Sequence, residues 1–274
     1  MNESFEPVSD KKQFDDYLDF AKRLAGIADE ISMSFFNQQQ SLQVSLKSDG
    51  SFVTKADKEI ERRLRHVINQ QFPNHGVLGE EHGEEHGEEL KDECYRWIID
   101  PIDGTHGFMR GFPVWATLIA LEYEGNIVVS MISAPALGAR WWAALGFGAY
   151  KSLLGNVSAI KVSNVDNLED SQVLYTGLRE CREKWTGFEE LMSMVWRERG
   201  VGDFWGHCLV AEGASEIMLD PIVNLWDVAA LYLLVTEAGG IMSDEKGRDT
   251  FRKGNAISSN QKVHDELMTL IHPQ

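Results

Sequence analysis

Residues 97–105 read Trp-Ile-Ile-Asp-Pro-Ile-Asp-Gly-Thr, and this stretch determines both the fold and the chemistry that the sequence predicts. Its three leading apolar residues predict a buried strand. Asp100 and Asp103 follow at once, and two carboxylates at a buried strand end are costly unless a cation such as Mg²⁺ neutralises them. Gly104 and Thr105 come next and offer backbone N–H groups for an anion. The stretch therefore indicates a metal-assisted phosphate site.

The composition restricts the classes of partner. The 274 residues include 26 basic and 43 acidic side chains, which gives a net charge of −17. A surface of this sign disfavours nucleic acid and anionic membranes as partners. It leaves a small phosphorylated substrate open, because bound cations reverse the local field. No run of 18 apolar residues occurs, and residues 1–12 lack the apolar core of a signal peptide.

The three cysteines, Cys94, Cys181 and Cys208, are widely separated. They form neither a disulfide framework nor a Cys-x-x-Cys metal pair. This usage is typical of a reducing compartment, so we expect a cytoplasmic protein.

The periodicity of apolar residues predicts an α+β first half, residues 1–150, and an α/β second half, residues 151–274. No linker rich in proline, glycine or serine separates them, so we expect a single domain over residues 1–274. Helices are predicted at 14–36, 56–72, 188–199 and 226–238, and strands at 42–47, 77–78, 97–99, 114–122, 127–135, 141–144 and 149–150.

Acidic residues recur where predicted elements begin or end. Glu80 follows the strand 77–78, and Asp227 lies at the start of the helix 226–238. Together with Asp100 and Asp103 they form a candidate set of metal ligands. Any one of these residues alone is better explained as a helix cap or a surface acid, and the group is more specific than its members.

The segment 82–89 repeats His-Gly-Glu-Glu. Histidines among glutamates are compatible with a transition-metal site, and the composition is also that of a solvated acidic loop, which we favour.

Three ordered motifs resemble the signatures of the inositol monophosphatase family. They are Gly-Glu-Glu at 79–81, Asp-Pro-Ile-Asp-Gly-Thr at 100–105, and Trp-Asp-Val-Ala-Ala at 226–230. Glu-Ala-Gly-Gly at 237–240 extends the third, and Lys47 and residues 53–57 match the family's N-terminal pattern. The resemblance implies a layered αβαβα sandwich and a Mg²⁺-dependent phosphomonoesterase with two to three ions in the site.

The resemblance also implies a role for each matching residue. Glu80, Asp100 and the carbonyl group of Ile102 would hold one metal ion, and Asp100, Asp103 and Asp227 a second, with a looser third ion near Glu80. The backbone of Gly104 and Thr105 would bind the phosphate group. Thr105 and Asp57 would orient the attacking water, and Glu81 would support a metal-bound water. His106 departs from the family, where many relatives have lysine or threonine.

Other segments resemble the histidinol-phosphatase branch of the family, notably Gly-Asp-Phe-Trp at 202–205. Relatives acting on inositol phosphate usually have a small neutral stretch there. Histidinol phosphate carries an ammonium group, which an acidic side chain would pair with. Asp203, Asp220 and Trp205 are therefore the candidate specificity residues, the alternatives being turns for the two acids and core packing for Trp205. Further matching stretches are 107–121, 133–137, 140–144 and 209–214.

The resulting hypothesis is a histidinol-phosphate phosphatase of histidine biosynthesis that forms a homodimer. The alternative within the family is an inositol-1-phosphatase or another sugar or nucleotide phosphatase. The alternative from a different class is a non-catalytic, cation-binding regulatory protein, which we disfavour because the four carboxylates and Thr105 are all present.

Overall fold

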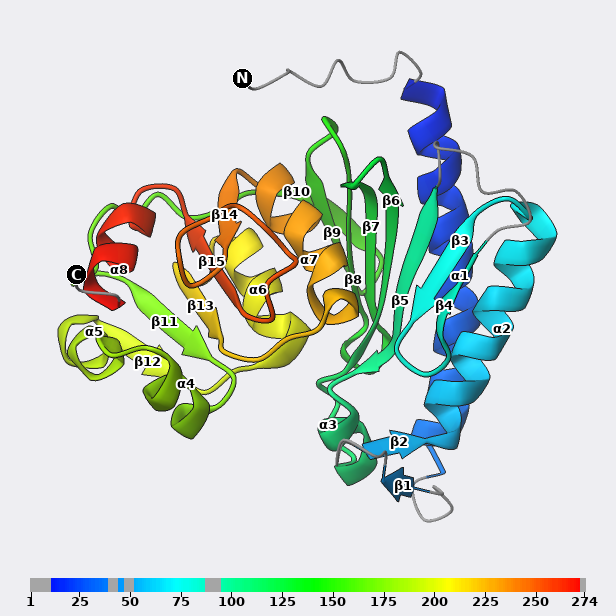
Figure 1. The fold of residues 1–274 in the computed structure, drawn as a ribbon, viewed down its shortest axis with the longest axis horizontal. Coiled ribbons are helices and arrows are strands. Elements are labelled where there is room, and N and C mark those ends of the chain that lie inside the picture. The colour runs from blue at the N-terminus through cyan, green and yellow to red at the C-terminus, as the bar shows by residue number, and fades with distance from the viewer. Residues whose placement is uncertain (1–10, 39–43, 47–51, 87–94, 272–274) are drawn as a thin grey trace.

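Helices and sheets alternate in five layers (Figure 1). The computed structural model describes residues 11–38, 44–46, 52–86 and 95–271. Lys47, Cys94, the predicted turn at 48–51 and residues 87–89 of the acidic segment lie outside these residues. The αβαβα arrangement implied by the resemblance is confirmed. Within the described chain, no helix combines the length and apolar character needed to cross a membrane.

The first layer consists of α1 (Lys11–Phe36) and α2 (Lys55–Gln71), which cover one face of the larger sheet. Both contain apolar residues at helical spacing, and these residues are buried: Tyr17, Ala21, Leu24 and Ala28 in α1, and Ile60, Leu64 and Ile68 in α2. At the start of α2, the Thr54 hydroxyl accepts the Ala56 N–H, and the Asp57 carboxylate accepts the Thr54 N–H. The predicted helices 14–36 and 56–72 are confirmed.

The second layer is the larger sheet, in which β3 and β5 run parallel and the other neighbours are antiparallel. The parallel register pairs Gly79 with Ile99, so the residues that follow, Glu80 and Asp100, lie side by side, with Asp100 still within β5. Within the described residues this sheet has eight strands in the order β10-β9-β8-β7-β6-β5-β3-β4. Their bounds are β3 Gly76–Gly79, β4 Gly83–Glu85, β5 Arg96–Asp103, β6 Ala116–Tyr123, β7 Asn126–Ala134, β8 Ala139–Ala144, β9 Ala149–Leu153 and β10 Asn156–Ile160.

The third layer, α6 (Asp203–Ala211) and α7 (Leu225–Glu237), lies between the two sheets. α7 contacts β6 and β7 of the larger sheet and β14 of the smaller sheet, while α6 contacts β13 and β15. A helix packed on both sides needs apolar residues around its whole circumference. α7 meets this requirement, with seven buried apolar residues: Val228, Ala229, Ala230, Leu231, Leu233, Leu234 and Val235.

The smaller sheet and the last helical layer complete the sandwich. The described strands have the order β12-β11-β13-β15-β14, and three helices cover the outer face. The strands are β11 Gln172–Tyr175, β12 Arg197–Arg199, β13 Ile217–Asp220, β14 Gly240–Ser243 and β15 Ala256–Asn260, and the helices are α4 Leu178–Lys184, α5 Phe188–Met194 and α8 His264–Ile271. Shorter elements are β1 Val44–Leu46, which pairs with β2 Phe52–Thr54, helix α3 Thr105–Arg110 and the 3₁₀ turn η2 Pro135–Leu137.

Two features differ from the sequence-based expectation. The predicted helix 188–199 is wrong in its second half: α5 ends at Met194, and Arg197–Arg199 forms β12 beside β11. The reason is tertiary, because β12 exists through its pairing with Gln172–Leu174. The larger sheet also extends to residue 160, past residue 150 where the sequence placed the division between the two halves.

Candidate active site

The candidate site begins where β5 ends. Asp100 and Asp103 are buried, and the pairing of β5 with β6 is irregular between them. This irregularity turns the backbone, and the N–H of Ile102 donates to Asp100 Oδ1 at 3.0 Å. Asp103 Oδ2 accepts the N–H of Phe204 at 2.8 Å, which connects β5 to α6 of the middle layer.

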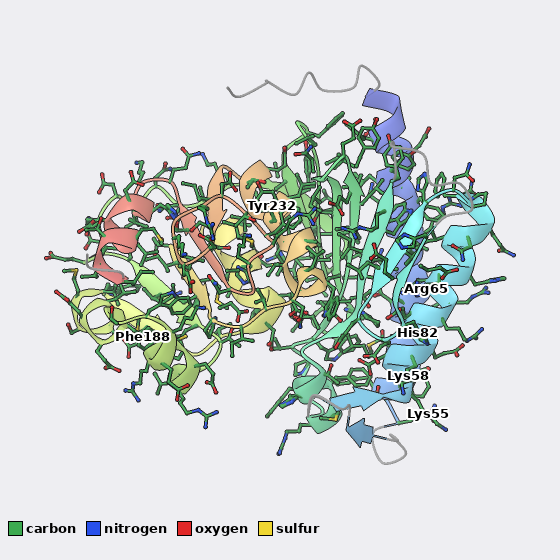
Figure 2. The ribbon with its side chains drawn as sticks, viewed as in Figure 1. Lys55, Lys58, Arg65, His82, Phe188 and Tyr232 are labelled. Carbon is green, nitrogen blue, oxygen red and sulfur yellow. The ribbon has the colours of Figure 1, made fainter. Side chains whose placement is uncertain are left out.

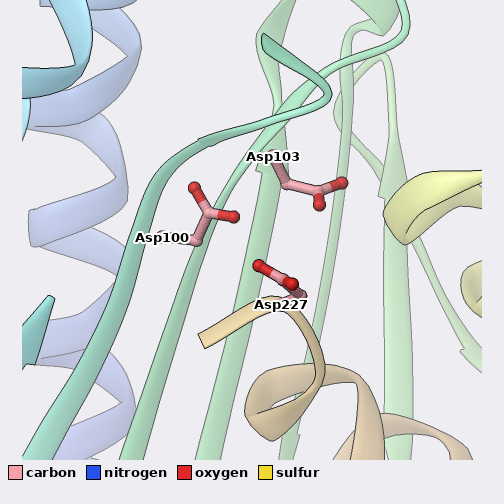
Figure 3. Close-up of side chains that lie close together, drawn as sticks. All are labelled: Asp100, Asp103 and Asp227. Carbon is pink, nitrogen blue, oxygen red and sulfur yellow. The ribbon is translucent and has the colours of Figure 1, made fainter. Parts of the chain in front are cut away.

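Asp227 comes from the opposite side of the site, in the first turn of α7. Its Oδ2 accepts the backbone N–H of Asn224 at 2.6 Å, so the helix cap fixes the orientation of the carboxylate. Asp100, Asp103 and Asp227 each offer a carboxylate oxygen, and these oxygens all lie within 4.8 Å of one another. Figure 3 shows the three side chains converging from β5 and from the N-terminus of α7.

The electrostatics of this group favour a bound cation. Burial raises the pKa of Asp100 well above its usual range, and the charges of Glu80, Asp103 and Asp227 raise it further. Burial and the charges of Asp203 and Asp227 raise the pKa of Asp103 in the same way. Burial raises the pKa of Asp227 to about 7, with Glu80 and Asp220 contributing. A divalent cation would remove this repulsion, and its preferred ligands are carboxylate oxygens.

Glu80 lies beside this group. Its backbone N–H donates to the carbonyl of Ile99 at 3.2 Å, which continues the β3–β5 pairing by one residue. Its charge raises the pKa of Asp100, Asp227 and Asp57, so its carboxylate lies near these three groups. In the described chain Glu80 is not one of the carboxylates whose oxygens all lie within 4.8 Å.

The predicted phosphate-binding turn follows β5. Gly104 has a φ of +82°, and a Cβ there would lie 3.0 Å from the Val114 carbonyl oxygen, so both conformation and space require glycine. The hydroxyl of Thr105 donates to the carbonyl oxygen of Ile102 at 2.9 Å, which joins two predicted site residues. Gly104 and Thr105 begin α3, where backbone N–H groups lack intrahelical acceptors.

Asp57 is fully buried at the start of α2. Its Oδ2 accepts the N–H and the hydroxyl of Thr54, whereas its Oδ1 has no hydrogen-bond partner among the described residues. Burial raises the pKa of Asp57 to about 7, with Glu81 and Glu80 adding to the shift. A buried carboxylate oxygen without a partner is costly, and a bound water or ion would satisfy it.

The three specificity candidates occupy different environments. Asp203 begins α6, and burial and the charge of Asp220 raise its pKa. Asp220 ends β13 and is buried, with Oδ2 3.8 Å from Nε2 of His207. Trp205 is partly buried against the central core, as the packing alternative expects. Asp203 Oδ2 lies 3.5 Å from the position of a Cβ built on Gly104, so it borders the predicted phosphate-binding turn.

Three further polar residues near the site are buried, and sequence reasoning missed two of them, Glu61 and Arg65. His207 is fully buried, with Nδ1 2.7 Å from the Ser258 hydroxyl oxygen. Glu61 and Arg65 of α2 are buried and bonded to the β3–β4 turn that follows Gly79. The available signal was the position of Glu61 and Arg65 within the apolar stripe of helix 56–72, where charged residues need a specific partner.

The fold and the site define a class, that of five-layered αβαβα proteins with an acidic site where β5 of the larger sheet ends and α7 begins. Residues 13–273 match the family described as the inositol monophosphatase family, so the chain belongs to that family.

Among its relatives, histidinol-phosphatase from Streptomyces coelicolor is 42% identical over 263 residues, which cover 92% of this chain and 97% of the relative. Histidinol-phosphatase from Mycobacterium tuberculosis is 40% identical, with 94% and 98% covered. A similar solved structure is the extragenic suppressor protein SuhB from Bartonella henselae, with a TM-score of 0.85 and 29% identity over 94% of this chain and 99% of that chain.

Proposed function

We propose that this protein is a Mg²⁺-dependent phosphomonoesterase that hydrolyses histidinol phosphate to histidinol and phosphate in histidine biosynthesis. The observation that carries the proposal is the convergence of Asp100, Asp103 and Asp227 next to a second acidic pair, Asp203 and Asp220. The first group suits cations, and the second suits the ammonium group of the substrate. The similarity to two histidinol-phosphatases supports this substrate.

We propose that the donor set would hold two to three divalent ions. Asp100, Asp103, Asp227, Glu80 and the carbonyl of Ile102 are hard oxygen donors in or beside one buried site. When bound, the ions supply Lewis acidity, which stabilises charge on the phosphate oxygens and lowers the pKa of bound water.

The chain itself orients the reactants. The backbone N–H groups of Gly104 and Thr105 would donate to phosphate oxygens, because N–H groups at the start of a helix lack intrahelical acceptors. Asp57 Oδ1 is the atom we assign to accept the proton of the attacking water, because it is buried and lacks a partner among the described residues. Thr105 would help to orient this water, and Glu81 would hold a second water at the site.

Asp203 and Asp220 would select the substrate. Asp220 is buried and Asp203 is partly buried, and the charge of Asp220 raises the pKa of Asp203, so a cation that neutralises the pair would stabilise it. The ammonium group of histidinol phosphate is such a cation, and the hydroxyl groups of an inositol ring are not. Trp205, partly buried, contributes packing that supports α6.

A panel of phosphate esters tests the proposal. With Mg²⁺ present, we expect histidinol phosphate to give the highest kcat/KM among histidinol phosphate, inositol 1-phosphate, fructose 1,6-bisphosphate and AMP. Asp100→Asn is expected to lower phosphate release by about 10²- to 10³-fold, and Asp166→Asn, which changes an exposed acid, to leave it unchanged. Faster turnover of inositol 1-phosphate would overturn the substrate assignment. A wild-type protein that releases no phosphate from any ester would point to the non-catalytic alternative.

The homodimer and the cytoplasmic location stay predictions. Light scattering on the purified protein measures the mass of the assembly. Cys181 and Cys208 are free and buried, in keeping with the reducing compartment that the sequence indicated.

A further inference from the structure

Glu61 and Arg65 form a buried ion pair on the inner face of α2 that the proposed chemistry does not use. Glu61 is fully buried and Arg65 is 7% exposed. Arg65 Nε donates to Glu61 Oε1 at 2.8 Å. Moving two opposite charges into the protein interior costs more desolvation free energy than forming the same ion pair at the surface. The buried pair therefore contributes little net stability by itself. Its hydrogen bonds to the backbone therefore indicate its role.

The carboxylate of Glu61 binds the backbone that follows the proposed cation ligand Glu80. Glu61 Oε2 accepts the N–H of Glu81 at 2.7 Å, and Oε1 accepts the N–H of His82 at 3.1 Å. Both oxygens thus hold consecutive peptide groups of the turn between β3 and β4. Hydrogen bonds to a charged acceptor are stronger than neutral ones, so this turn is held in one conformation.

Arg65 binds the two strands on either side of the same turn. Its guanidinium group donates to the carbonyl of Val77 on β3 at 3.2 Å and to the carbonyl of Gly83 on β4. It also donates to Oε2 of Glu85 at 3.2 Å. Figure 2 places Arg65 on the side of α2 that faces β3 and β4, with His82 nearby at the turn. One side chain therefore connects both arms of the hairpin.

Gly79, at the end of β3, provides the space for the Glu61 carboxylate. A Cβ built on Gly79 would lie 2.2 Å from Glu61 Oε1 and 2.7 Å from Oε2. Alanine at this position would displace the carboxylate from the turn. Glycine is needed here because it leaves space for the carboxylate and not because of its backbone conformation, since Gly79 does not have a positive φ.

We propose that Glu61 and Arg65 are positioning residues that hold the β3–β4 turn so that Glu80 faces Asp100 and binds the divalent cation. The inference rests on the proposed cation-dependent function. Residues that orient metal ligands commonly change metal affinity 10- to 100-fold when they are substituted. The predicted effect is therefore on cation affinity, beyond any effect on stability.

A matched control pair lies on the same helix. Arg62 and Glu59 form an ion pair at 2.7 Å, and their side chains are 64% and 43% exposed. This pair bonds to no part of the β3–β4 turn among the interactions of the described residues. Glu59→Gln therefore changes the same charge on α2 and leaves the turn intact.

The experiment measures Mn²⁺ binding to the substrate-free protein by calorimetry or electron paramagnetic resonance, together with the Mg²⁺ concentration that gives half-maximal activity. We expect Glu61→Gln and Gly79→Ala to weaken Mn²⁺ binding by about 10- to 100-fold and to raise the Mg²⁺ requirement by a similar factor. Glu59→Gln, and Gly76→Ala on the same strand, where an added Cβ meets nothing closer than 3.4 Å, are expected to match the wild type.

The outcomes separate this inference from the proposed function. If the wild type does not bind Mn²⁺, or if Asp100→Asn binds it equally well, the proposed function fails. If the wild type binds Mn²⁺ through Asp100 and the folded Glu61→Gln protein binds it with equal affinity, only the positioning role is overturned. If Glu61→Gln does not fold, Gly79→Ala decides the question. Gly79→Ala keeps the charges of Glu61 and Arg65 and displaces the Glu61 carboxylate.

Discussion

Asp203 has a left-handed backbone conformation, with a φ of +54°, at the start of α6. This conformation costs a residue other than glycine ~1 kcal/mol or more, and such strain persists where neighbouring contacts require it. Here the next residue, Phe204, donates its N–H to Asp103 Oδ2. The strained backbone thus connects the proposed cation site and the proposed ammonium site.

We expect Asp203→Asn to impair the binding of a cationic substrate selectively. Asparagine tolerates the left-handed region, so the substitution removes the charge and keeps the backbone. A hydrogen bond between charged groups contributes about 1.5–3 kcal/mol, so KM for histidinol phosphate is expected to rise roughly 10- to 100-fold. Steady-state kinetics with a neutral ester such as glycerol 2-phosphate provide the control, and an equal rise in both KM values would show that Asp203 does not select for charge.

At the residue scale, the sequence predicted Asp100, Asp103 and Asp227 as a group, and the structure brings their oxygens together. This was possible because each acid follows or begins an apolar element, and because the motifs are specific. The positive φ of Asp203 and the bonds of Glu61 to the β3–β4 turn were not predictable. They depend on how separate elements meet in space, which periodicity does not encode.

At the element scale, α6 carries Asp203 and rests closely on β13. A Cβ built on Gly206 would lie 2.3 Å from Met218 Sδ on β13 and 2.9 Å from the carbonyl oxygen of Val201. Glycine therefore sets the distance between this helix and the smaller sheet. The position of the specificity residue Asp203 depends on that distance.

Gly206→Ala is expected to destabilise the protein by about 1–3 kcal/mol, because overpacking forces the helix or Met218 to shift. The shift also moves Asp203, so KM for histidinol phosphate is expected to rise. Chemical denaturation and kinetics measure the two effects. Met218→Ala removes the side chain that the added methyl group meets, so the double substitution should cost less stability than the sum of the two single ones, and strictly additive effects would show that Gly206 and Met218 are not coupled.

Helices with one apolar stripe were predicted from the sequence within a few residues, as for α1 and α2. The failure at 188–199 has a physical cause. Arg197–Arg199 is wholly exposed and has no apolar pattern of its own, and it becomes a strand by pairing with β11, about 25 residues earlier in the chain. Strand identity at a sheet edge depends on such a distant partner.

At the scale of the whole molecule, we propose that residues 1–274 fold as a single domain. One hydrophobic cluster contains residues from both sheets and from the helices between them, such as Leu118 on β6, Leu234 on α7 and Met242 on β14. Ser130 on β7 also donates its hydroxyl hydrogen to the Ala230 carbonyl of α7 at 2.6 Å. The acidic site lies at the junction of these layers, so its charge state affects the stability of the whole protein.

The metal-free protein is expected to lose stability as the pH rises from about 4 to about 7. Burial raises the pKa of Asp57 and Asp227 to about 7, so the folded state keeps these protons at a pH where the unfolded chain has released them. Stability is fully present below the unfolded pKa and is lost as the pH passes through the folded pKa. Between pH 5 and pH 8, Tm in chelator is therefore expected to fall by more than about 5 °C.

Mg²⁺ should reverse this loss most strongly at pH 8, because the ionised carboxylates are its ligands and binding to the folded state raises Tm. Thermal unfolding followed by circular dichroism and tryptophan fluorescence, with and without Mg²⁺, measures both effects, and coincident curves would support a single domain. Asp57→Asn/Asp227→Asn removes two of the carboxylates whose pKa burial raises, so its metal-free Tm should depend less on pH than that of the wild type. A metal-free wild-type Tm that is constant or rises over this range would contradict the assignment of Asp57 and Asp227 as the destabilising charges.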